Sequence, residues 1–155
     1  LDDAHYQQML KATTQLNTPG TELAGLEGVH ALTDVTGFGL AGHAWEMARG
    51  AKARVLIDYA RLPKIDGVEA LAEQGFITGA SERNWQGYGE HVQLFDGCTA
   101  WQQALLTDPQ TSGGLLVSCA PECAEQVLQV FRQHRFEQAC IIGEIQAGPA
   151  GVQVV

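Results

Sequence analysis

The sequence predicts an α/β (α+β) protein in which a mixed β-sheet packs against helices. Stretches with apolar residues at helical spacing alternate with short apolar runs typical of strands, in the order α-β-α-β-α-loop-α-β-α-β-β. The composition is that of a folded globular protein, since 45% of the 155 residues are hydrophobic and 17% are charged. A chain of this length is expected to form a single domain with a buried core, spanning residues 1–155.

Helical spacing occurs in residues 2–16, 21–26, 40–49, 67–74 and 98–106, and a last helix is predicted to begin at Pro121. Glycine is common just after the end of a helix, so Gly50 and Gly75 are predicted to stop the third and fourth of these. Strands are predicted at residues 29–33, 52–58, 91–94, 115–118, 139–145 and 151–155, with a Gly148-Pro149 turn between the last two.

Two glycine-rich segments lack a clear period. Residues 78–90, T-G-A-S-E-R-N-W-Q-G-Y-G-E, are predicted to form a long ordered loop, a kind of segment that often carries function. Residues 107–114, T-D-P-Q-T-S-G-G, have two interpretations that the sequence leaves open. In the first, they form a tight turn between a helix and a strand, with Pro109 fixing φ. In the second, they line a ligand cleft.

The main functional signal is in residues 29–42, V-H-A-L-T-D-V-T-G-F-G-L-A-G. This pattern predicts a strand that ends in Thr33 and Asp34, a corner made flexible by Gly37 and Gly39, and then a helix. Glycine lets backbone N–H groups approach an anion closely, and the first turn of a helix offers unpaired N–H donors. The corner is therefore a candidate phosphate site.

Residues 37–42 also fit the G-x-G-x-x-G pattern of dinucleotide-binding folds, and the next strand ends in Asp58, about where a ribose-binding acid is expected. Asp34 argues against that interpretation. A carboxylate about 4 Å from a pyrophosphate oxygen is repelled by roughly 4 kcal/mol per charge pair at an effective dielectric near 20. Mg2+ removes this repulsion by binding both groups, so Asp34 is interpreted as a ligand of a Mg2+-nucleotide. The plain alternative is that Asp34 is the N-cap of the following helix.

Composition also limits the partners and the compartment. The net charge of −9 argues against nucleic acid or an anionic membrane as a partner. No run approaches the roughly 20 apolar residues of a membrane span, and the start L-D-D-A-H-Y does not resemble a signal peptide. The sequence also lacks an initiator Met, so a fragment of a longer protein is expected. Cys98, Cys119, Cys123 and Cys140 lack zinc-ligand spacing, so reduced thiols in a cytoplasmic protein are expected.

Several motifs resemble those of one known family. They are T-D-V-T-G-F-G-L-A-G-H at residues 33–43, S-E-R-N at 81–84 and D-P-Q-T-S-G-G-L-L at 108–116. The shorter L-N-T-P-G at 16–20 and I-G-E-I at 142–145 agree with them. Together these motifs closely resemble the C-terminal half of the selenophosphate synthetase (selenide, water dikinase) family, and the resemblance runs over nearly the whole chain.

This resemblance implies a fold and a reaction. The implied fold is that of the C-terminal domain of the aminoimidazole ribonucleotide synthetase superfamily. The implied reaction requires Mg2+ and turns ATP, selenide and water into selenophosphate, orthophosphate and AMP. By the resemblance, Asp34 is a Mg2+ ligand that this domain contributes to an ATP site, which agrees with the charge argument above.

The resemblance also implies that an N-terminal half is absent from this sequence. In the family that half carries the reactive Cys or selenocysteine, a neighbouring Lys and other metal-binding Asp residues, and the homodimer forms mainly through it. None of the four cysteines here has that context, so no catalytic residue is expected in this chain. Alone, the chain is expected to be inactive and to bind ATP weakly or not at all.

Thr36, Gly37 and Gly39 are predicted to lie around the phosphates, although their conformation alternatively serves only the turn. Residues 111–114 are weaker candidates for the wall of a cleft, and His43, Asn84 and Trp85 are predicted to be structural. Two other functions stay open. One is a dinucleotide-binding, Rossmann-like module that uses Asp58 and needs no Mg2+, and the other is a non-catalytic domain that binds a protein partner, most naturally the missing half.

Overall fold

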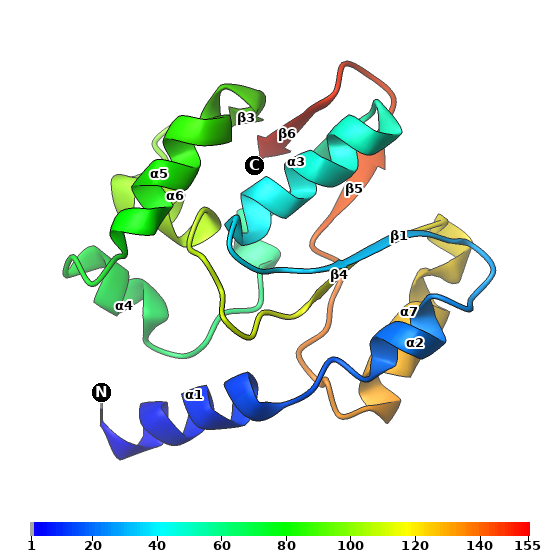
Figure 1. Cartoon of the computed structure of the whole chain (residues 1–155), viewed down its shortest axis with the longest axis horizontal. Helices are drawn as coiled ribbons and strands as arrows, with labels where there is room; N and C mark the ends of the chain where they lie inside the picture. Colours follow the sequence, from blue (N-terminus) through cyan, green and yellow to red (C-terminus); the bar gives the residue numbers. More distant parts are fainter. Residues whose placement is uncertain (1) are drawn as a thin grey trace.

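The computed structural model describes residues 2–155 and contains two β-sheets flanked by helices (Figure 1). The larger sheet is mixed and has the strand order β3-β6-β2-β5, with β6 parallel to β3 and β2, and β5 antiparallel to β2. Its strands are β2 (Arg54–Ile57), β3 (Val92–Gln93), β5 (Gly143–Gln146) and β6 (Gly151–Val154). The smaller sheet is an antiparallel pair of β1 (Val29–Asp34) and β4 (Leu115–Cys119). The predicted mixed α/β class is confirmed, with the strands divided between two sheets.

The helices are α1 (Asp3–Thr14), α2 (Pro19–Leu23), α3 (Gly39–Ala51), α4 (Val68–Glu73), α5 (Gly79–Tyr88), α6 (Ala100–Leu106) and α7 (Ala124–Gln133), with short 3-10 turns at Tyr59–Arg61, Gly89–His91 and Pro121–Cys123. The prediction that Gly50 stops the third helix is wrong, because α3 continues to Ala51. Lys52 instead adopts the left-handed conformation, with φ 53°, and its N–H bonds the carbonyl groups of Ala48 and Arg49. None of the helices within residues 2–155 has the length and hydropathy to cross a membrane.

The prediction of a long loop at residues 78–90 is also wrong, because most of this segment is helix α5. Thr78 caps the helix, since its hydroxyl oxygen accepts a hydrogen bond from the Ser81 N–H at 3.3 Å. Each glycine in a helix costs about 1 kcal/mol relative to alanine, which is why the sequence resembles a loop. Tertiary packing outweighs this cost, since Ser81 and Tyr88 are both buried.

Two groups of apolar side chains form the core. The first lies between the larger sheet and helices α3, α5 and α6, and contains Ala41, Ala44, Ile57, Tyr59, Tyr88, Val92, Leu106, Val152 and Val154. On β6 it takes alternate residues, as expected for a strand with one covered face. The second lies between α2, α7 and the smaller sheet, and contains Leu23, Cys123, Val127, Val130 and Phe131. Figure 1 shows α3 crossing the larger sheet and α2 lying beside α7.

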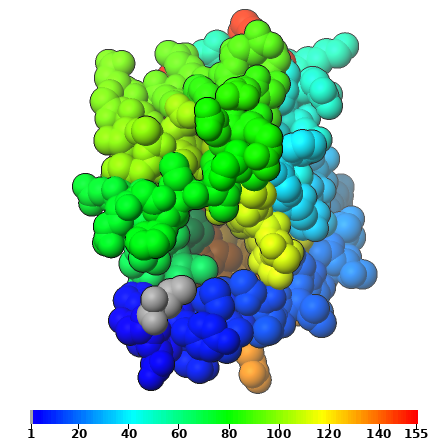
Figure 2. Space-filling model, turned by 60° about the vertical axis from the view of Figure 1, so that its left-hand side comes forward, coloured from blue at the N-terminus to red at the C-terminus, as the bar shows by residue number. Residues whose placement is uncertain are grey.

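Helix α1 is only loosely attached to this body. It has no buried residue. The Gln8 amide nitrogen donates to Asp66 Oδ2 at 3.1 Å, and the Asp66 N–H donates to Gln8 Oε1 at 3.2 Å. Figure 2 shows the blue N-terminal segment below the green and yellow segments, with a hollow between them.

Candidate functional site

Asp34 is the last residue of β1, and its side chain is exposed. No ion pair joins it to another residue in the described part of the chain. It lines a hollow of about 160 Å3. The other lining residues are Thr13, Gln15, Leu16, Asn17, Thr36, Thr111, Ser112 and Gly113. The hollow therefore brings Asp34 and Thr36 together with three of the four residues predicted for a cleft wall.

Close backbone contacts hold the 107–114 segment against the end of β1. The Val35 N–H donates to the Gly114 carbonyl at 2.9 Å, and the Gln110 N–H donates to the Thr36 carbonyl at 3.0 Å. A Cβ atom at Gly113 would lie 2.0 Å from the Val35 carbonyl oxygen, so only glycine fits there. Asn17 closes the far side, because its amide nitrogen donates to the Gly113 carbonyl at 2.9 Å. The segment thus forms both a turn and one wall of the hollow.

Gly39 makes the corner between β1 and α3 possible. Its φ is 69°, and a Cβ atom there would lie 2.7 Å from the Thr107 carbonyl carbon. Its N–H donates to the Thr36 carbonyl at 3.1 Å, which closes a turn. Gly37, by contrast, is exposed, and a Cβ atom added there would meet no other atom within 4 Å. The N-cap position of α3 is occupied by Phe38, so the alternative that Asp34 caps this helix is wrong.

His43 holds Thr36 from inside the first turn of α3. Its side chain is buried, and Nε2 accepts hydrogen bonds from the Thr36 N–H at 3.0 Å and from Thr36 Oγ1 at 3.1 Å. Since Nε2 is an acceptor, the ring proton lies on Nδ1. Glu46 Oε2 is 2.8 Å from Nδ1, but Nδ1 has no hydrogen-bond partner among the described residues. His43 therefore has a structural role, and because its ring accepts from the Thr36 N–H, that N–H is not free to bind a ligand.

Helix α5 holds the same corner from the other side. The Asn84 amide nitrogen donates to the carbonyl oxygens of Gly37 at 2.8 Å and Thr107 at 2.9 Å. The Tyr88 hydroxyl donates to the Phe38 carbonyl, and burial raises the pKa of Tyr88 to about 12. The sequence predicts a structural Asn84 but gives no role to Tyr88. A helix prediction for residues 78–90 could have revealed the role of Tyr88, because residues four apart, such as Asn84 and Tyr88, lie on one face of a helix.

Asp108 is also held by hydrogen bonds at the start of α5. Its Oδ1 accepts hydrogen bonds from Thr78 Oγ1 and from Ser81 Oγ, each at 3.1 Å. Sequence reasoning missed this role, since the D-P-Q-T-S-G-G pattern alone does not show what its acid contacts. Asp108 therefore fixes the 107–114 segment to the start of α5.

The cysteines do not form a metal centre. No group of three or more His, Cys, Asp or Glu side chains in the described residues is arranged to hold a metal ion. The four thiols are free, and burial raises the pKa of Cys98 and of Cys119. A raised pKa favours the neutral thiol, which is a poor nucleophile and a poor metal ligand.

The dinucleotide alternative does not fit the topology. A Rossmann unit places the strand before the glycine motif parallel to the next strand in one sheet. Here β1 and β2 lie in different sheets, and β1 pairs only with β4 within the described chain. Asp58 caps a 3-10 turn, since its Oδ1 accepts from the Ala60 N–H at 3.0 Å.

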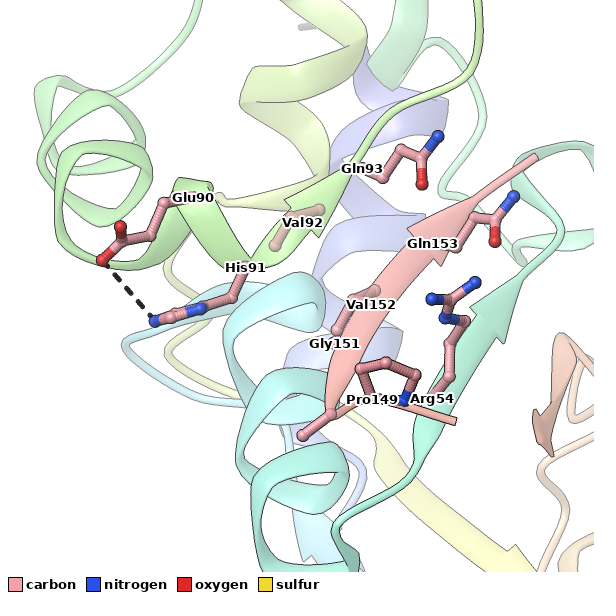
Figure 3. A pocket seen from close by; sticks show the side chains of 10 residues that line it. Arg54, Glu90, His91, Val92, Gln93, Pro149, Gly151, Val152 and Gln153 are labelled. Atoms are coloured by element: carbon pink, nitrogen blue, oxygen red, sulfur yellow. Dashed lines mark ion pairs between the residues drawn. The ribbon is translucent and has the colours of Figure 1, made fainter. Parts of the chain in front are cut away.

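A second hollow, of about 220 Å3, lies at the larger sheet and does not include Asp34. Figure 3 shows Arg54, Gln93 and Gln153 on one side of this sheet, whereas Glu90 and His91 lie on the other side of β3. His91 stacks on Trp45, with ring centroids 4.0 Å apart, and its Nε2 is 3.7 Å from Glu90 Oε1. None of the predicted site residues lines this second hollow.

Comparison with known proteins agrees with this fold and with the motifs. In sequence, the chain is 62% identical over 154 residues to a selenide, water dikinase of Pseudomonas straminea and 58% identical over 154 residues to one of Burkholderia ambifaria. Each match covers 99% of this chain, but only 43% and 44% of those relatives. The chain thus spans less than half the length of the curated relatives it matches.

Among solved structures, the chain resembles the hydrogenase maturation protein HypE in complex with ATP, with a TM-score of 0.56 and 22% sequence identity. The match covers 90% of this chain and 36% of the HypE chain. This likeness supports the fold alone. The family described as AIR synthase related protein, C-terminal domain, matches residues 7–155. The chain therefore belongs to the AIR synthase related family and corresponds to its C-terminal domain.

Proposed function

We propose that this chain is the C-terminal part of a selenide, water dikinase and supplies Asp34 as a Mg2+ ligand to its ATP site. The complete enzyme, a cytoplasmic homodimer, would make selenophosphate, orthophosphate and AMP from selenide, ATP and water. The reaction is supported by identity of 62% and 58% to proteins named selenide, water dikinase. The role of Asp34 is supported by one observation: an exposed carboxylate without an ion pair in the described residues lines a mainly polar hollow.

The residues at the hollow fit a Mg2+-nucleotide. Mg2+ prefers oxygen ligands and is usually held by one or two carboxylates together with phosphate oxygens and waters. Within the described residues Asp34 is the one acid that lines the hollow, so the nucleotide and the rest of the enzyme would complete the ligand set. When bound, Mg2+ supplies positive charge that offsets the negative charge of the phosphates.

The corner residues would contribute position and polarity. Phe38 has right-handed helical φ and ψ, and Gly39 is left-handed, a sequence of conformations that turns successive N–H groups toward one side and favours an anion. The Gly37 N–H makes no hydrogen bond to another described residue. The Thr36 and Gly39 N–H groups are used internally, so their part is to shape the corner. Catalysis here would be positioning and charge neutralisation, with no proton transfer by Asp34.

The proposal is tested by calorimetric titration of the chain with ATP, with and without Mg2+, alone and then mixed with the separately produced remainder of the Pseudomonas straminea relative. We expect weak or no binding by the chain alone and Mg2+-dependent binding by the mixture. Binding of NADH without Mg2+ would support a dinucleotide module instead. Association with the remainder, but no nucleotide binding by the mixture, would support a non-catalytic interaction domain.

A further inference from the structure

We infer that Asn84 and Tyr88 are positioning residues that set the direction of the peptide groups in the corner formed by residues 36–39. The inference rests on the proposed function, in which the N–H groups of this corner that make no hydrogen bond within the described chain, those of Gly37 and Phe38, face a phosphate. Neither residue lines the hollow, so neither would touch the nucleotide from there. Both act through the backbone of the glycine motif.

The contacts are made by two side chains one helical turn apart. Asn84 and Tyr88 are at positions i and i+4 of α5, so they project from one face of the helix. They donate to two successive carbonyl groups, Asn84 to Gly37 at 2.8 Å and Tyr88 to Phe38. Tyr88 is 8% exposed, so water does not readily replace its hydroxyl as the donor.

Peptide planarity turns these contacts into a constraint on the N–H groups. In a trans peptide the C=O and the following N–H point in opposite directions. With the Gly37 carbonyl directed at Asn84, the Phe38 N–H must point away from α5. With the Phe38 carbonyl directed at Tyr88, the Gly39 N–H points away as well, toward the Thr36 carbonyl. If the Gly37–Phe38 peptide flipped, a carbonyl oxygen would replace the Phe38 N–H on the side opposite α5 and would repel an anion there. If the Phe38–Gly39 peptide flipped, the Gly39 N–H would lose its hydrogen bond to the Thr36 carbonyl, which closes the turn.

The same helix couples the corner to the wall of the hollow. The Asn84 amide nitrogen also donates to the Thr107 carbonyl at 2.9 Å, so one amide holds two segments that are far apart in sequence. Asp108 bonds the hydroxyls of Thr78 and Ser81 at the start of α5. Residues 36–39 and 107–110 are thus held to one another through α5.

The first test uses the 155-residue chain and needs no nucleotide. Asn84→Asp replaces an amide donor by an oxygen that faces two carbonyl oxygens, and Tyr88→Phe removes only the hydroxyl. Amide hydrogen exchange, followed by NMR, is expected to become at least about tenfold faster at residues 36–39 and 107–110 in Asn84→Asp, while β2 and β6 stay unchanged. Tyr88→Phe should act mainly at residues 38 and 39.

Gln86→Glu is the matched control, since it makes the same amide-to-acid change on α5 at a side chain whose one hydrogen bond in the described residues is to Glu82, at 3.3 Å. It should leave the exchange at residues 36–39 unchanged. Unchanged exchange at the corner in Asn84→Asp, or an equal increase throughout the chain, would overturn the inference.

The second test separates positioning from a general loss of stability. In a chimera where this chain replaces the matching part of the Pseudomonas straminea relative, Asn84→Asp is expected to raise the KM for Mg2+-ATP about tenfold, with kcat changed less than twofold. Val130→Ala, on the buried face of α7 in the second core group, is the comparison, and the Tm of both variants is measured first. It destabilises the fold at a site that does not contact the corner.

The inference fails if Asn84→Asp leaves the KM unchanged, or if Val130→Ala raises it equally. If the unmodified chimera has no ATP-dependent turnover, the proposed function fails. The hydrogen-exchange experiment still decides whether α5 sets the direction of the peptide groups in residues 36–39.

Discussion

Asp34 is the residue on which the proposed chemistry depends, and the structure gives its side chain no partner in the described residues that would explain it otherwise. Asp34→Asn removes the charge without creating a cavity, because the side chain is exposed. In the complete enzyme we expect at least a roughly 100-fold loss of Mg2+-ATP turnover, equivalent to about 2.7 kcal/mol of transition-state stabilisation. The Tm should change by no more than about 1 °C, as is usual for an exposed substitution. Steady-state kinetics and thermal melts check both statements.

The matched control is Asp3→Asn, an exposed acid in the first turn of α1, which should leave turnover unchanged. Turnover of Asp34→Asn within twofold of the unmodified enzyme would refute the metal-ligand role. Asp34 could be singled out from sequence because the reason is local: a carboxylate three residues before a glycine corner needs a cation if a phosphate is to bind nearby.

Gly39 and Gly37 are alike in sequence but have different requirements in the structure. Gly39 combines a φ of 69° with a position where an added Cβ would lie only 2.7 Å from the Thr107 carbonyl carbon, so Gly39→Ala adds both backbone strain and a clash. We expect a loss of about 2–4 kcal/mol in the free energy of unfolding, measured by urea denaturation. Gly37→Ala, where a Cβ meets no atom within 4 Å, should cost less than about 1 kcal/mol. Equal losses for the two variants would contradict the packing described for the corner.

At the scale of elements, most helices and strands follow from the spacing of apolar residues, and α5 is the informative exception. Its glycines and its polar residues give no helical stripe, and its stability comes from contacts made by Asn84, Tyr88 and the capping Thr78. The contacts of Asn84 and Tyr88 join segments far apart in the chain, so a local pattern does not contain them, whereas the Thr78 cap is local. The predicted end of α3 is wrong for a local reason, since Lys52 rather than a glycine adopts the left-handed conformation.

Tyr88 gives α5 a measurable dependence on pH. Burial raises its pKa to about 12, above the ordinary tyrosine value near 10, so the folded state favours the protonated hydroxyl. The stability that this provides is complete below about pH 10 and is lost as the pH rises toward about 12. Burial also raises the pKa of Tyr59, which adds to the loss. We therefore expect the Tm to fall more steeply above about pH 10 in the unmodified chain than in Tyr88→Phe.

Thermal melts across this pH range make the comparison. Tyr6→Phe is the control, because Tyr6 is 46% exposed on α1, and its melting curve should follow that of the unmodified chain. A Tyr88→Phe variant with the same steep fall would show that this hydroxyl does not support the corner.

At the scale of the whole molecule, the sequence alone did not predict that the strands divide into two sheets. The strand patterns give the residues that face a core, but not which strands pair, and β1 and β4 form a separate antiparallel pair. That pair carries the end of β1, with Asp34, next to the 107–114 segment, where Thr111, Ser112 and Gly113 line the same hollow. The residue types of the site were therefore predictable, whereas their grouping depends on pairing between distant strands.

The excess of negative charge is also a property of the whole molecule. A net charge of −9 on 155 residues produces self-repulsion that opposes the compact state. Raising NaCl from about 20 to about 200 mM shortens the screening length from roughly 20 to roughly 7 Å, so the Tm at pH 7.5 should rise by a few degrees. The same change near the isoelectric point, pH 4.8, should have little effect on the Tm. An equal rise at both pH values would show that charge repulsion is not the cause.

The loosely attached first helix has a practical consequence. Because α1 buries no side chain, the free energy that holds it to the body is small, and Lys11 is exposed to a protease. Brief digestion with trypsin should release the first eleven residues while the remaining polypeptide keeps its melting temperature within about 2 °C, as mass spectrometry and calorimetry would record. A tag or a fluorophore attached ahead of this cut would then leave the folded body undisturbed.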